Sequence, residues 1–370
     1  MKDFWKKQIE KHGKLVFLAP MDGYGDSAYR QAMKKVAPHI FSISEFYSAD
    51  GLVHSKFLAD SVLPHDKSED PLVIQIFGKD PENFAKAAKI ISDPKYNIAG
   101  IDVNMGCPAK KVVRSGHGSS LMINVETAFE IVRALNEATH LPISVKTRRS
   151  FDGNQDLLAF AKGLEEAGAS LITIHGRTMK QAYTGVADWT DIHELQKHLK
   201  IPVIGNGDVQ NYKDGMEKVK DLAGFMIGRA TFGNPWCFVS QADIDEIDSL
   251  PLHSGTSTPF NKGGSNLKKE NFIDGVYHPS LREILELMQF HAEKLVETKG
   301  EKKGSLEIRK HLVQYLKHFP GVKAYRKRLV TTDSLENSIS IINEIRDTFK
   351  DFLDKRPSLG EIEKEEVDLN

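Results

Sequence analysis

Short apolar runs recur between residues 16 and 230, and each is followed by Gly, Asn or Pro and then by a helical pattern. The runs are rich in Val, Ile, Leu and Phe, and their apolarity is nearly continuous rather than alternating. Continuous apolarity is typical of strands that are buried on both faces of a sheet. We count eight runs, which begin near Val16, Ile40, Leu72, Ile98, Ile143, Leu171, Val203 and Gly224. The pattern therefore predicts eight strands.

The segments between these runs have a different period, with apolar residues three to four positions apart. Clear examples are residues 81–91, 125–138, 156–169 and 189–199. This spacing predicts amphipathic helices that connect parallel strands. Eight βα units match a closed (β/α)8 TIM barrel better than an open doubly wound sheet. We therefore expect an α/β fold built on a TIM barrel.

The pattern changes after Trp236. Residues 245–280 are rich in Ser, Thr, Pro, Gly and Asn, which is typical of a flexible insertion or linker, although residues 272–277 resemble a small hairpin with an Asp-Gly turn. Residues 281–350 return to a helical period. The predicted organisation is a barrel domain over residues 1–244, a linker over 245–280, a small helical domain over 281–350 and an acidic tail over 351–370.

Charge is distributed unevenly along the chain, although the net charge is only -1. Residues 299–330 contain ten Lys or Arg and two Glu, whereas residues 351–370 contain seven acidic and three basic side chains. A strongly basic segment makes a polyanionic partner plausible. A charge run is also typical of a solvated helix face, so both interpretations stay open at this point.

Several classes of protein are disfavoured by composition. The two cysteines, Cys107 and Cys237, form no CxxC pair, which argues against a disulfide framework and against a zinc site. His193 and His198 are five positions apart and would lie on different faces of a helix, so no metal site is expected. There is no apolar run long enough for a membrane span or a signal peptide. We expect a cytoplasmic protein without membrane or metal binding.

Polar side chains follow the predicted strands, where the chemistry of a barrel is located. Each has an ordinary structural explanation, such as a buried thiol or a core histidine, but eight coincident strand ends are harder to explain that way. Together they offer donors for an anionic, heteroaromatic ligand such as a flavin, and the last two ends suit a phosphate. The strand ends carry Pro20, Met21 and Asp22, then Glu45, Gln75, Asn104 with Cys107, Lys146 with Arg148, His175 with Arg177, Asn206 with Gly207 and Asp208, and Gly228 with Arg229.

One long loop is the most specific motif of the chain. Residues 104–112 read NMGCPAKKV and residues 116–121 read GHGSSL. This loop resembles the N-x-G-C-P-x-x-K-V-x-x-x-G-x-G-S/A-x-L loop of the FMN-dependent tRNA-dihydrouridine synthases. Residues 146–148, 175–178, 206–208 and 228–229 are similar to other motifs of that family, and residues 309–311 resemble the R-K-H of its RNA-binding domain. The DGYGD of residues 22–26 and the long 245–280 segment depart from the family pattern.

The resemblance implies that NADPH reduces bound FMN, which then reduces the C5=C6 bond of a uridine in tRNA. It implies that Cys107 is the catalytic proton donor, within an FMN-binding barrel followed by a tRNA-binding helical domain. The implied flavin contacts are Pro20, Met21, Asp22, Gln75, Asn104, Lys146, His175, Asn206, Gly207, Asp208, Gly228 and Arg229. The implied tRNA contacts are Lys110, Arg148, Arg177, Arg309, Lys310 and Arg326.

Two alternatives remain at the level of the sequence. Another FMN barrel, similar to a dihydroorotate dehydrogenase or an ene-reductase, would act on a free small molecule. Such an enzyme would need neither the basic helical segment nor the complete cysteine loop. An RNA-binding module on an inactive barrel is the other alternative, and Cys107 and Lys146 argue against it. The missing dinucleotide fingerprint at residues 116–121 favours FMN over FAD in either flavoprotein.

Overall fold

The computed structural model describes residues 3–249, 267–317, 319 and 321–354. The chain forms two compact units. The first contains the residues up to Asp26, His39–Gln210 and Asp214–Gly228. The second contains Ser27–Pro38, Asn211–Lys213 and the chain from Arg229 onward. Short segments between barrel strands therefore belong to the second unit.

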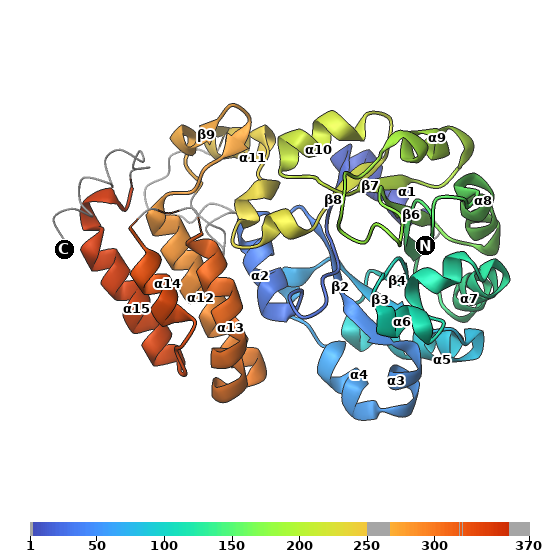
Figure 1. Cartoon of the computed structure of the whole chain (residues 1–370), viewed down its shortest axis with the longest axis horizontal. Coiled ribbons are helices and arrows are strands. Elements are labelled where there is room, and N and C mark those ends of the chain that lie inside the picture. The colour runs from blue at the N-terminus through green and yellow to red at the C-terminus, as the bar shows by residue number, and fades with distance from the viewer. Residues whose placement is uncertain (1–2, 250–266, 318, 320, 355–370) are drawn as a thin grey trace. The chain divides into compact units, whose positions relative to one another are not determined.

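Eight parallel strands form a closed barrel in the first unit (Figure 1). β1 pairs with both β2 and β8, which closes the sheet on itself. The predicted fold class and the predicted strands are thereby confirmed. The strands are β1 (Leu15–Leu18), β2 (Phe41–Ser48), β3 (Leu72–Phe77), β4 (Gly100–Met105), β5 (Ile143–Arg148), β6 (Leu171–His175), β7 (Val203–Asn206) and β8 (Gly224–Ile227).

Helices alternate with these strands, and local signals set their ends. In α5, Asp80 accepts a hydrogen bond from the Glu82 amide and Pro81 begins the first turn. In α8, Asp156 caps the start and Gly168 ends the helix with φ of 111°. The helices are α1 (Phe4–His12), α2 (Ser27–Val36), α3 (Ala49–His54), α4 (Lys56–Val62), α5 (Pro81–Ile91), α6 (Lys110–Arg114), α7 (Val125–Ala138), α8 (Leu157–Ala167), α9 (Thr190–His198) and α10 (Tyr212–Val219).

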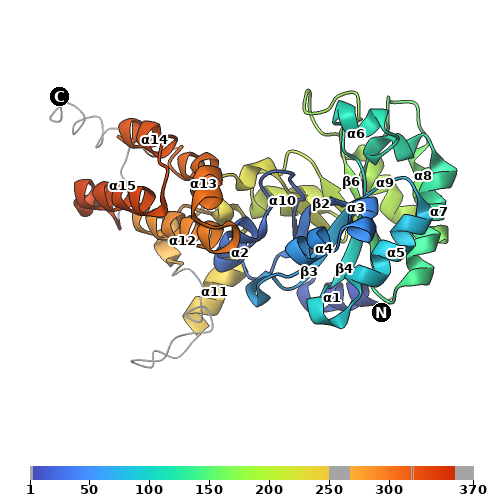
Figure 2. The ribbon, with the colours of Figure 1, turned by 90° about the horizontal axis from the view of Figure 1, so that it is seen from below.

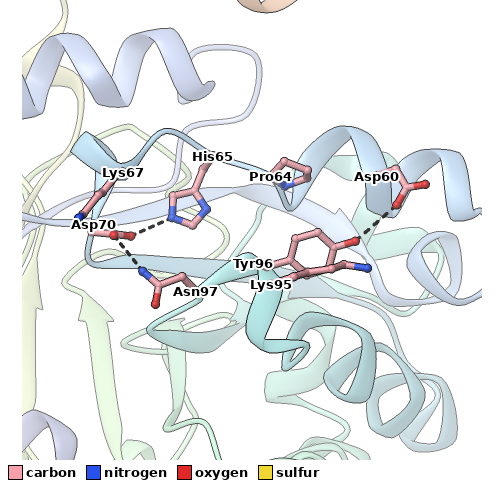
Figure 3. A pocket seen from close by; sticks show the side chains of 8 residues that line it. All are labelled: Asp60, Pro64, His65, Lys67, Asp70, Lys95, Tyr96 and Asn97. Atoms are coloured by element: carbon pink, nitrogen blue, oxygen red, sulfur yellow. Dashed lines mark hydrogen bonds and ion pairs between the residues drawn. The ribbon is translucent and has the colours of Figure 1, made fainter.

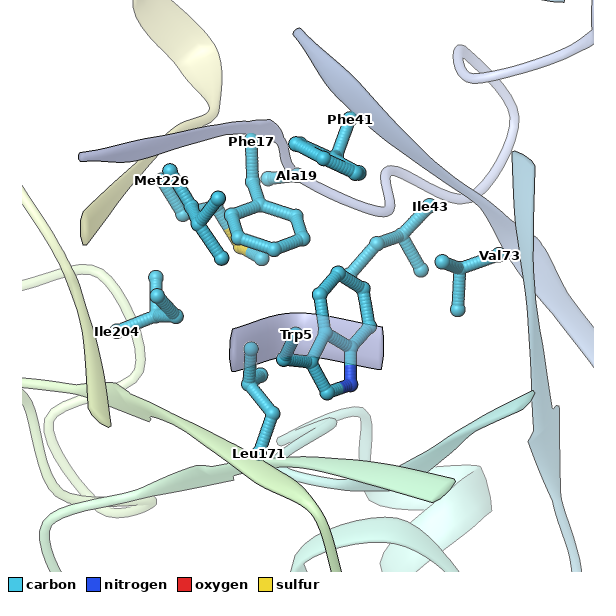
Figure 4. Close-up of a cluster of buried hydrophobic side chains, with 10 residues drawn as sticks. Trp5, Phe17, Ala19, Phe41, Ile43, Val73, Leu171, Ile204 and Met226 are labelled. Carbon is cyan, nitrogen blue, oxygen red and sulfur yellow. The ribbon is translucent and has the colours of Figure 1, made fainter. Parts of the chain in front are cut away.

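The amino-terminal helix α1 supplies a side chain to the barrel interior. Trp5 is 1% exposed and packs with apolar residues from β1, β2, β3, β6, β7 and β8 (Figure 4). Its ring centroid lies 5.6 Å from that of Phe17 and 5.7 Å from that of Phe41. This contribution was not predicted from the charged stretch before Leu15. The cluster consists of Trp5, Leu15, Phe17, Ala19, Phe41, Ile43, Val73, Leu171, Ile204 and Met226.

The second unit is largely helical, as predicted for residues 281–350 (Figure 2). Ser280 and Glu283 form a capping box that starts its longest described helix, α12. α12 packs against α13, α15 and α2. The helices are α11 (Gln241–Ser249), α12 (Leu281–Lys299), α13 (Glu301–Tyr315), α14 (Lys323–Leu329) and α15 (Leu335–Thr348). No helix in the described ranges has the length and apolarity to cross a membrane.

The segment expected to be a linker contains regular structure at both ends. Residues 245–249 continue α11, and β9 (Phe272–Ile273) pairs antiparallel with β10 (Val276–Tyr277). This is the hairpin predicted at the Asp-Gly turn, where Asp274 and Gly275 both have positive φ. Residues 250–266 of the predicted linker and residues 355–370 of the predicted acidic tail lie outside the described residues.

Candidate active site

The barrel interior changes from apolar to polar along the strands. Side chains two positions apart on a strand point to the same side, so Gln75, Thr173 and Asn206 follow Val73, Leu171 and Ile204 of the apolar cluster. One further step along β4, β5 and β6 brings Asn104, Lys146 and His175 to the carboxyl ends of the strands. In β4 and β5, Asn104 is directly opposite Lys146. The predicted polar ring therefore lies next to a buried apolar layer, on the side of the carboxyl ends of the strands.

A buried hydrogen-bonded chain lies within this polar region. The carboxylate of Asp102 accepts from Gln75 Nε2 at 2.7 Å and from Ser144 Oγ at 2.6 Å. Gln75 Oε1 in turn accepts from Asn104 Nδ2 at 2.8 Å. Asp102 is fully buried, and sequence reasoning did not single it out. The available signal was a charged residue inside an otherwise apolar strand.

The backbone around Cys107 is held on both sides. Asn104 Oδ1 accepts from the Gly106 amide at 3.2 Å and from the Cys107 amide at 3.0 Å. The Cys107 carbonyl accepts from Ser119 Oγ at 2.9 Å and from the Ser119 amide at 3.3 Å. Gly118 has φ of 58°, and a Cβ there would lie 3.2 Å from the Cys107 Cβ, so this close approach requires glycine. The two halves of the predicted motif therefore meet at the backbone of Cys107.

The Cys107 side chain is half-buried, and its surroundings favour the protonated thiol. Burial is the main cause that raises the pKa of Cys107 above its ordinary value, and the negative charge of Asp22 adds to this effect. The Ala109 amide and the charges of Arg148 and Lys146 act in the opposite direction but do not cancel it. A thiol with a raised pKa is an available proton donor at neutral pH.

Lys146 carries an ammonium group at the barrel mouth. Burial is the main cause that lowers the pKa of Lys146 to about 8, and the charge of Arg148 lowers it further, whereas Asp102 and Cys107 raise it. Within the described chain, its Nζ makes no hydrogen bond or ion pair. A half-buried cation without an acceptor is costly unless a ligand supplies one. Lys146 is thus suited to an electronegative ligand atom.

His175 ends β6 with its ring partly accessible. Its Nδ1 accepts from the Arg177 amide at 3.2 Å, which assigns the proton of the neutral ring to Nε2. Beneath it in the same strand, Thr173 Oγ1 is buried and has no hydrogen-bond partner among the described residues. The end of β6 therefore presents donors to the barrel mouth.

A glycine follows each of the strands β7 and β8, and the loop that contains Ala187 packs closely against the first of them. Gly207 has φ of 121°, and a Cβ there would lie 2.6 Å from Ala187, so the position requires glycine. Asn206 Nδ2 donates to the Met226 carbonyl at 2.9 Å, which joins β7 to β8. Gly228 directly follows β8, and Arg229 begins the short 3-10 helix η4 (Arg229–Thr231). Backbone amides at such a turn are suited to a phosphate group.

Asp208 has a structural function in this region. Its carboxylate accepts from Arg177 Nη1 at 2.7 Å and from the Ala187 amide at 2.8 Å. A carboxylate would also repel the phosphate that the sequence assigned to this position. Asp208 therefore anchors the loop between β6 and α9, and only its backbone can face a phosphate.

Arg148 and Arg177, which the resemblance assigned to tRNA, support loops in the structure. Each is 4% exposed. Arg148 donates to the carbonyls of Gly106, Thr178 and Ala182, at 2.8 to 3.0 Å. Arg177 donates to the carbonyls of Thr184 and Gly185 in addition to Asp208. Lys110, at the start of α6, is the exposed cation among the three.

Comparisons with known proteins fit this arrangement. A family model described as dihydrouridine synthase matches residues 17–351, which include the cysteine loop and the helical segment. The chain belongs to the dihydrouridine synthase family. It is therefore an oxidoreductase. A family match that extends through the helices also disfavours the predicted alternatives, a flavin barrel for free small molecules and an inactive RNA-binding barrel.

Curated relatives agree with the family match. The chain is 32% identical to "Probable tRNA-dihydrouridine synthase 1" of Synechocystis sp., over 90% of this chain and 87% of that protein. It is 30% identical to "tRNA-dihydrouridine synthase B" of Pasteurella multocida, over 88% and 91% of the two chains. Among solved structures, an old yellow enzyme homologue from Zymomonas mobilis aligns with 68% of this chain and 94% of its own, at 13% identity and a TM-score of 0.44.

The residues of the R-K-H motif, 309–311, differ in burial and in hydrogen-bond partners. Arg309 donates to the Thr332 carbonyl, and so holds the turn between α14 and α15. His311 is buried beside His291, with ring centroids 4.6 Å apart, and burial keeps the pKa of His311 well below its ordinary value. Lys310 is half-buried. Arg326 is also half-buried, and its Nε has no partner among the described residues.

A cavity of about 580 Å³ lies at the opposite end of the barrel, beside the starts of β3 and β4 (Figure 3). Its polar groups pair with one another, because Asp70 accepts from His65 and from Asn97, both at 2.9 Å. Across the cavity, Tyr96 donates to Asp60 at 3.4 Å. The residues that the sequence assigned to the active site do not line it. Barrel chemistry belongs to the other end, so this cavity is not part of the candidate active site.

Proposed function

We propose that the protein is an FMN-dependent tRNA-dihydrouridine synthase, which uses NADPH to reduce the C5=C6 bond of a uridine in tRNA. The observation that carries the proposal is the Cys107 thiol, which is kept protonated on a doubly anchored loop beside Lys146. The printed names of the family and its relatives supply the substrate class. A free thiol that must stay reduced suits the cytoplasm, where tRNA is also found.

The residues of the barrel mouth fit a flavin mononucleotide. Thr173 Oγ1 is buried without a hydrogen-bond partner among the described residues, Lys146 Nζ has no acceptor among them either, and His175 can donate from Nε2. The turns after β7 and β8 suit a single phosphate, which favours FMN over a dinucleotide. Arg229 would add positive charge to that phosphate. The proposed flavin contacts are Pro20, Met21, Asp22, Gln75, Asn104, Lys146, His175, Asn206, the backbone of Gly207 and Asp208, Gly228 and Arg229.

The chain's own residues then have distinct functions in the reaction. When bound and reduced, FMN supplies the hydride that adds to C6 of the uracil ring. Cys107 donates a proton to C5, which quenches the negative charge that develops there. A stacked uridine cannot reach a barrel mouth, so the base must turn out of the tRNA. Lys110, which is exposed at the start of α6 in the same loop, would contact the adjacent phosphates.

The direct test uses the purified protein and unmodified tRNA transcripts. Heating is expected to release FMN, and incubation with NADPH is expected to convert one or more uridines to dihydrouridine, detected by nucleoside mass spectrometry. Orotate and simple enones serve as controls for free small-molecule substrates. Recovery of FAD, or turnover of the small molecules without any change to tRNA, would contradict the proposal.

The basic segment of the second unit is the proposed surface for the body of the tRNA. Arg309, Lys310 and Arg326 remain proposed contacts, although Arg309 also has a structural partner in Thr332. Lys323 and Lys327 are exposed, lie one turn apart on α14 and make no ion pair with a described residue. Exposed cations on one helix face are the type of side chain that contacts phosphates.

Replacing both Lys323 and Lys327 by Ala is expected to weaken tRNA binding and its salt dependence. Each lost phosphate contact lowers the slope of log K against log salt by about 0.7 to 0.9. Binding is measured by filter retention or fluorescence anisotropy at several salt concentrations. Lys86→Ala is the matched control, because Lys86 is exposed on α5 and already pairs with Glu82. If the double variant keeps the wild-type slope of log K against log salt, Lys323 and Lys327 do not contact tRNA and α14 is an ordinary solvated helix.

A further inference from the structure

Asp102 is the buried end of the hydrogen-bonded chain that leads to the catalytic loop. An ionised carboxylate only accepts hydrogen bonds, so Gln75 must turn its amide nitrogen toward Asp102 and its oxygen toward Asn104. Asn104 must then use its own amide nitrogen on Gln75. Its oxygen is thereby left facing the amides of Gly106 and Cys107.

We propose that Asp102 is a positioning residue, whose acceptor-only carboxylate sets the orientation of the Gln75 and Asn104 amides so that Asn104 holds the backbone of Cys107. Asp102 does not touch the thiol, and acts through two intervening side chains. The inference deepens the proposed function, and rests on it only for the catalytic role of Cys107.

The charge on Asp102 is hard to explain by packing alone. Burial raises the pKa of Asp102 to about 6, although the hydrogen bonds from Gln75 and Ser144 and the charge of Lys146 oppose this rise. Keeping a carboxylate ionised inside a barrel is costly, and an amide of the same shape would avoid the charge. An asparagine amide differs from the ionised carboxylate because its nitrogen can donate a hydrogen bond.

Asp102→Asn is expected to release the chain from its single orientation, because the new amide can present either its oxygen or its nitrogen to Gln75, and Ser144 Oγ can donate or accept in turn. In the reversed arrangement, the new amide donates to Gln75 Oε1 and Gln75 donates to the oxygen of Asn104. The amide nitrogen of Asn104 would face the Gly106 and Cys107 amides, which would lose their acceptor. Loss of such a hydrogen bond is expected to speed amide exchange at Gly106 and Cys107 by roughly 3- to 10-fold. Exchange is followed by NMR or by mass spectrometry on flavin-loaded protein.

A second change is expected to restore the arrangement. In Asp102→Asn combined with Asn104→Asp, the new carboxylate at position 104 can accept from Gln75 and from both loop amides. Protection of Gly106 and Cys107 is then expected to return to within about 2-fold of the wild type. Ser144→Ala, measured well above pH 6, is the matched control, because it removes a donor to Asp102 while the carboxylate stays ionised and an acceptor only. Protection in this control is expected to stay unchanged.

Acidification tests the same inference without any substitution. As the pH falls through about 6, Asp102 gains a proton and can donate, so the orientation of Gln75 is no longer imposed. Wild-type protection factors at Gly106 and Cys107 are expected to fall over this range, whereas those of Asp102→Asn are expected to stay flat. This measurement applies even if the single variant folds poorly.

Alkylation of Cys107 by iodoacetamide provides an independent readout, because Cys237 is buried and reacts slowly. Faster labelling in Asp102→Asn and recovery in the double variant are expected. Unchanged exchange in the folded single variant, no rescue in the double variant, or wild-type protection that is independent of pH would each overturn the inference. If the wild type fails to reduce tRNA while these exchange results hold, the proposed function fails and the positioning role of Asp102 stands.

Discussion

Cys107→Ala is expected to slow reduction of tRNA by about 10²- to 10⁴-fold while the protein still folds, binds flavin and oxidises NADPH. The large loss follows from removing a positioned proton donor from the second half of the reaction. The first half does not use the thiol, so its rate is expected to remain close to that of the wild type. If Cys107 were only a packing residue, its replacement would cost some stability and would leave turnover of folded protein nearly intact.

Stopped-flow absorbance separates the two half-reactions for this test. Cys237→Ala is the control, because Cys237 is the other thiol and is buried. The wild-type rate with tRNA is expected to decline only above the ordinary pH range of thiol ionisation, since burial raises the pKa of Cys107. That decline is expected to be absent from the residual rate of the variant. A tRNA half-reaction within a few-fold of the wild type would remove Cys107 from the mechanism.

Trp5→Ala is expected to lower the free energy of unfolding by about 3 to 5 kcal/mol, the usual loss when a large buried aromatic is truncated. Trp5 is 1% exposed, and it fills the apolar end of the barrel between Phe17 and Phe41. Its removal leaves a cavity lined by strands that cannot close around it, because the barrel's hydrogen bonds hold their spacing.

Urea unfolding followed by circular dichroism measures this effect. Trp5→Phe is expected to cost clearly less, because it keeps an aromatic ring and because the Trp5 Nε1 has no hydrogen-bond partner among the described residues. Phe57→Ala is the surface control, since Phe57 is 83% exposed. A loss below about 1 kcal/mol for Trp5→Ala would contradict the view that α1 is an integral part of the barrel.

The strands and the cysteine loop could be predicted from the sequence because the patterns that indicate them involve only neighbouring residues. A strand that is buried on both faces needs nearly continuous apolarity, and each of the eight runs has it. The hairpin at residues 272–277 was also readable, because an Asp-Gly pair favours the positive φ that its turn requires. The contribution of Trp5 could not be predicted from the sequence, because nothing in a short amphipathic helix indicates which of its large side chains, Phe4 or Trp5, enters the barrel.

The sequence did not reveal the hydrogen-bond partners of individual charged residues. Arg148 and Arg177 lie at strand ends as expected, but their guanidinium groups are occupied by carbonyls of Ala182 and Gly185, which come later in the chain. Arg309 belongs to a basic segment that the sequence revealed, yet it holds the Thr332 carbonyl. Sequence position shows that a cation is present, but its partners depend on how distant loops return to it.

The sequence by itself determined the barrel, the helical segment that follows it and the loop that carries Cys107, because periodicity and turn chemistry act over a few neighbouring residues. Only the tertiary structure decided which polar groups are satisfied. Asp102, Gln75 and Ser144 are on three different strands, and pairing in register brings them together. Their hydrogen bonds exist only after the sheet has closed, so the connection from a buried carboxylate to the Cys107 backbone becomes visible only in the folded barrel.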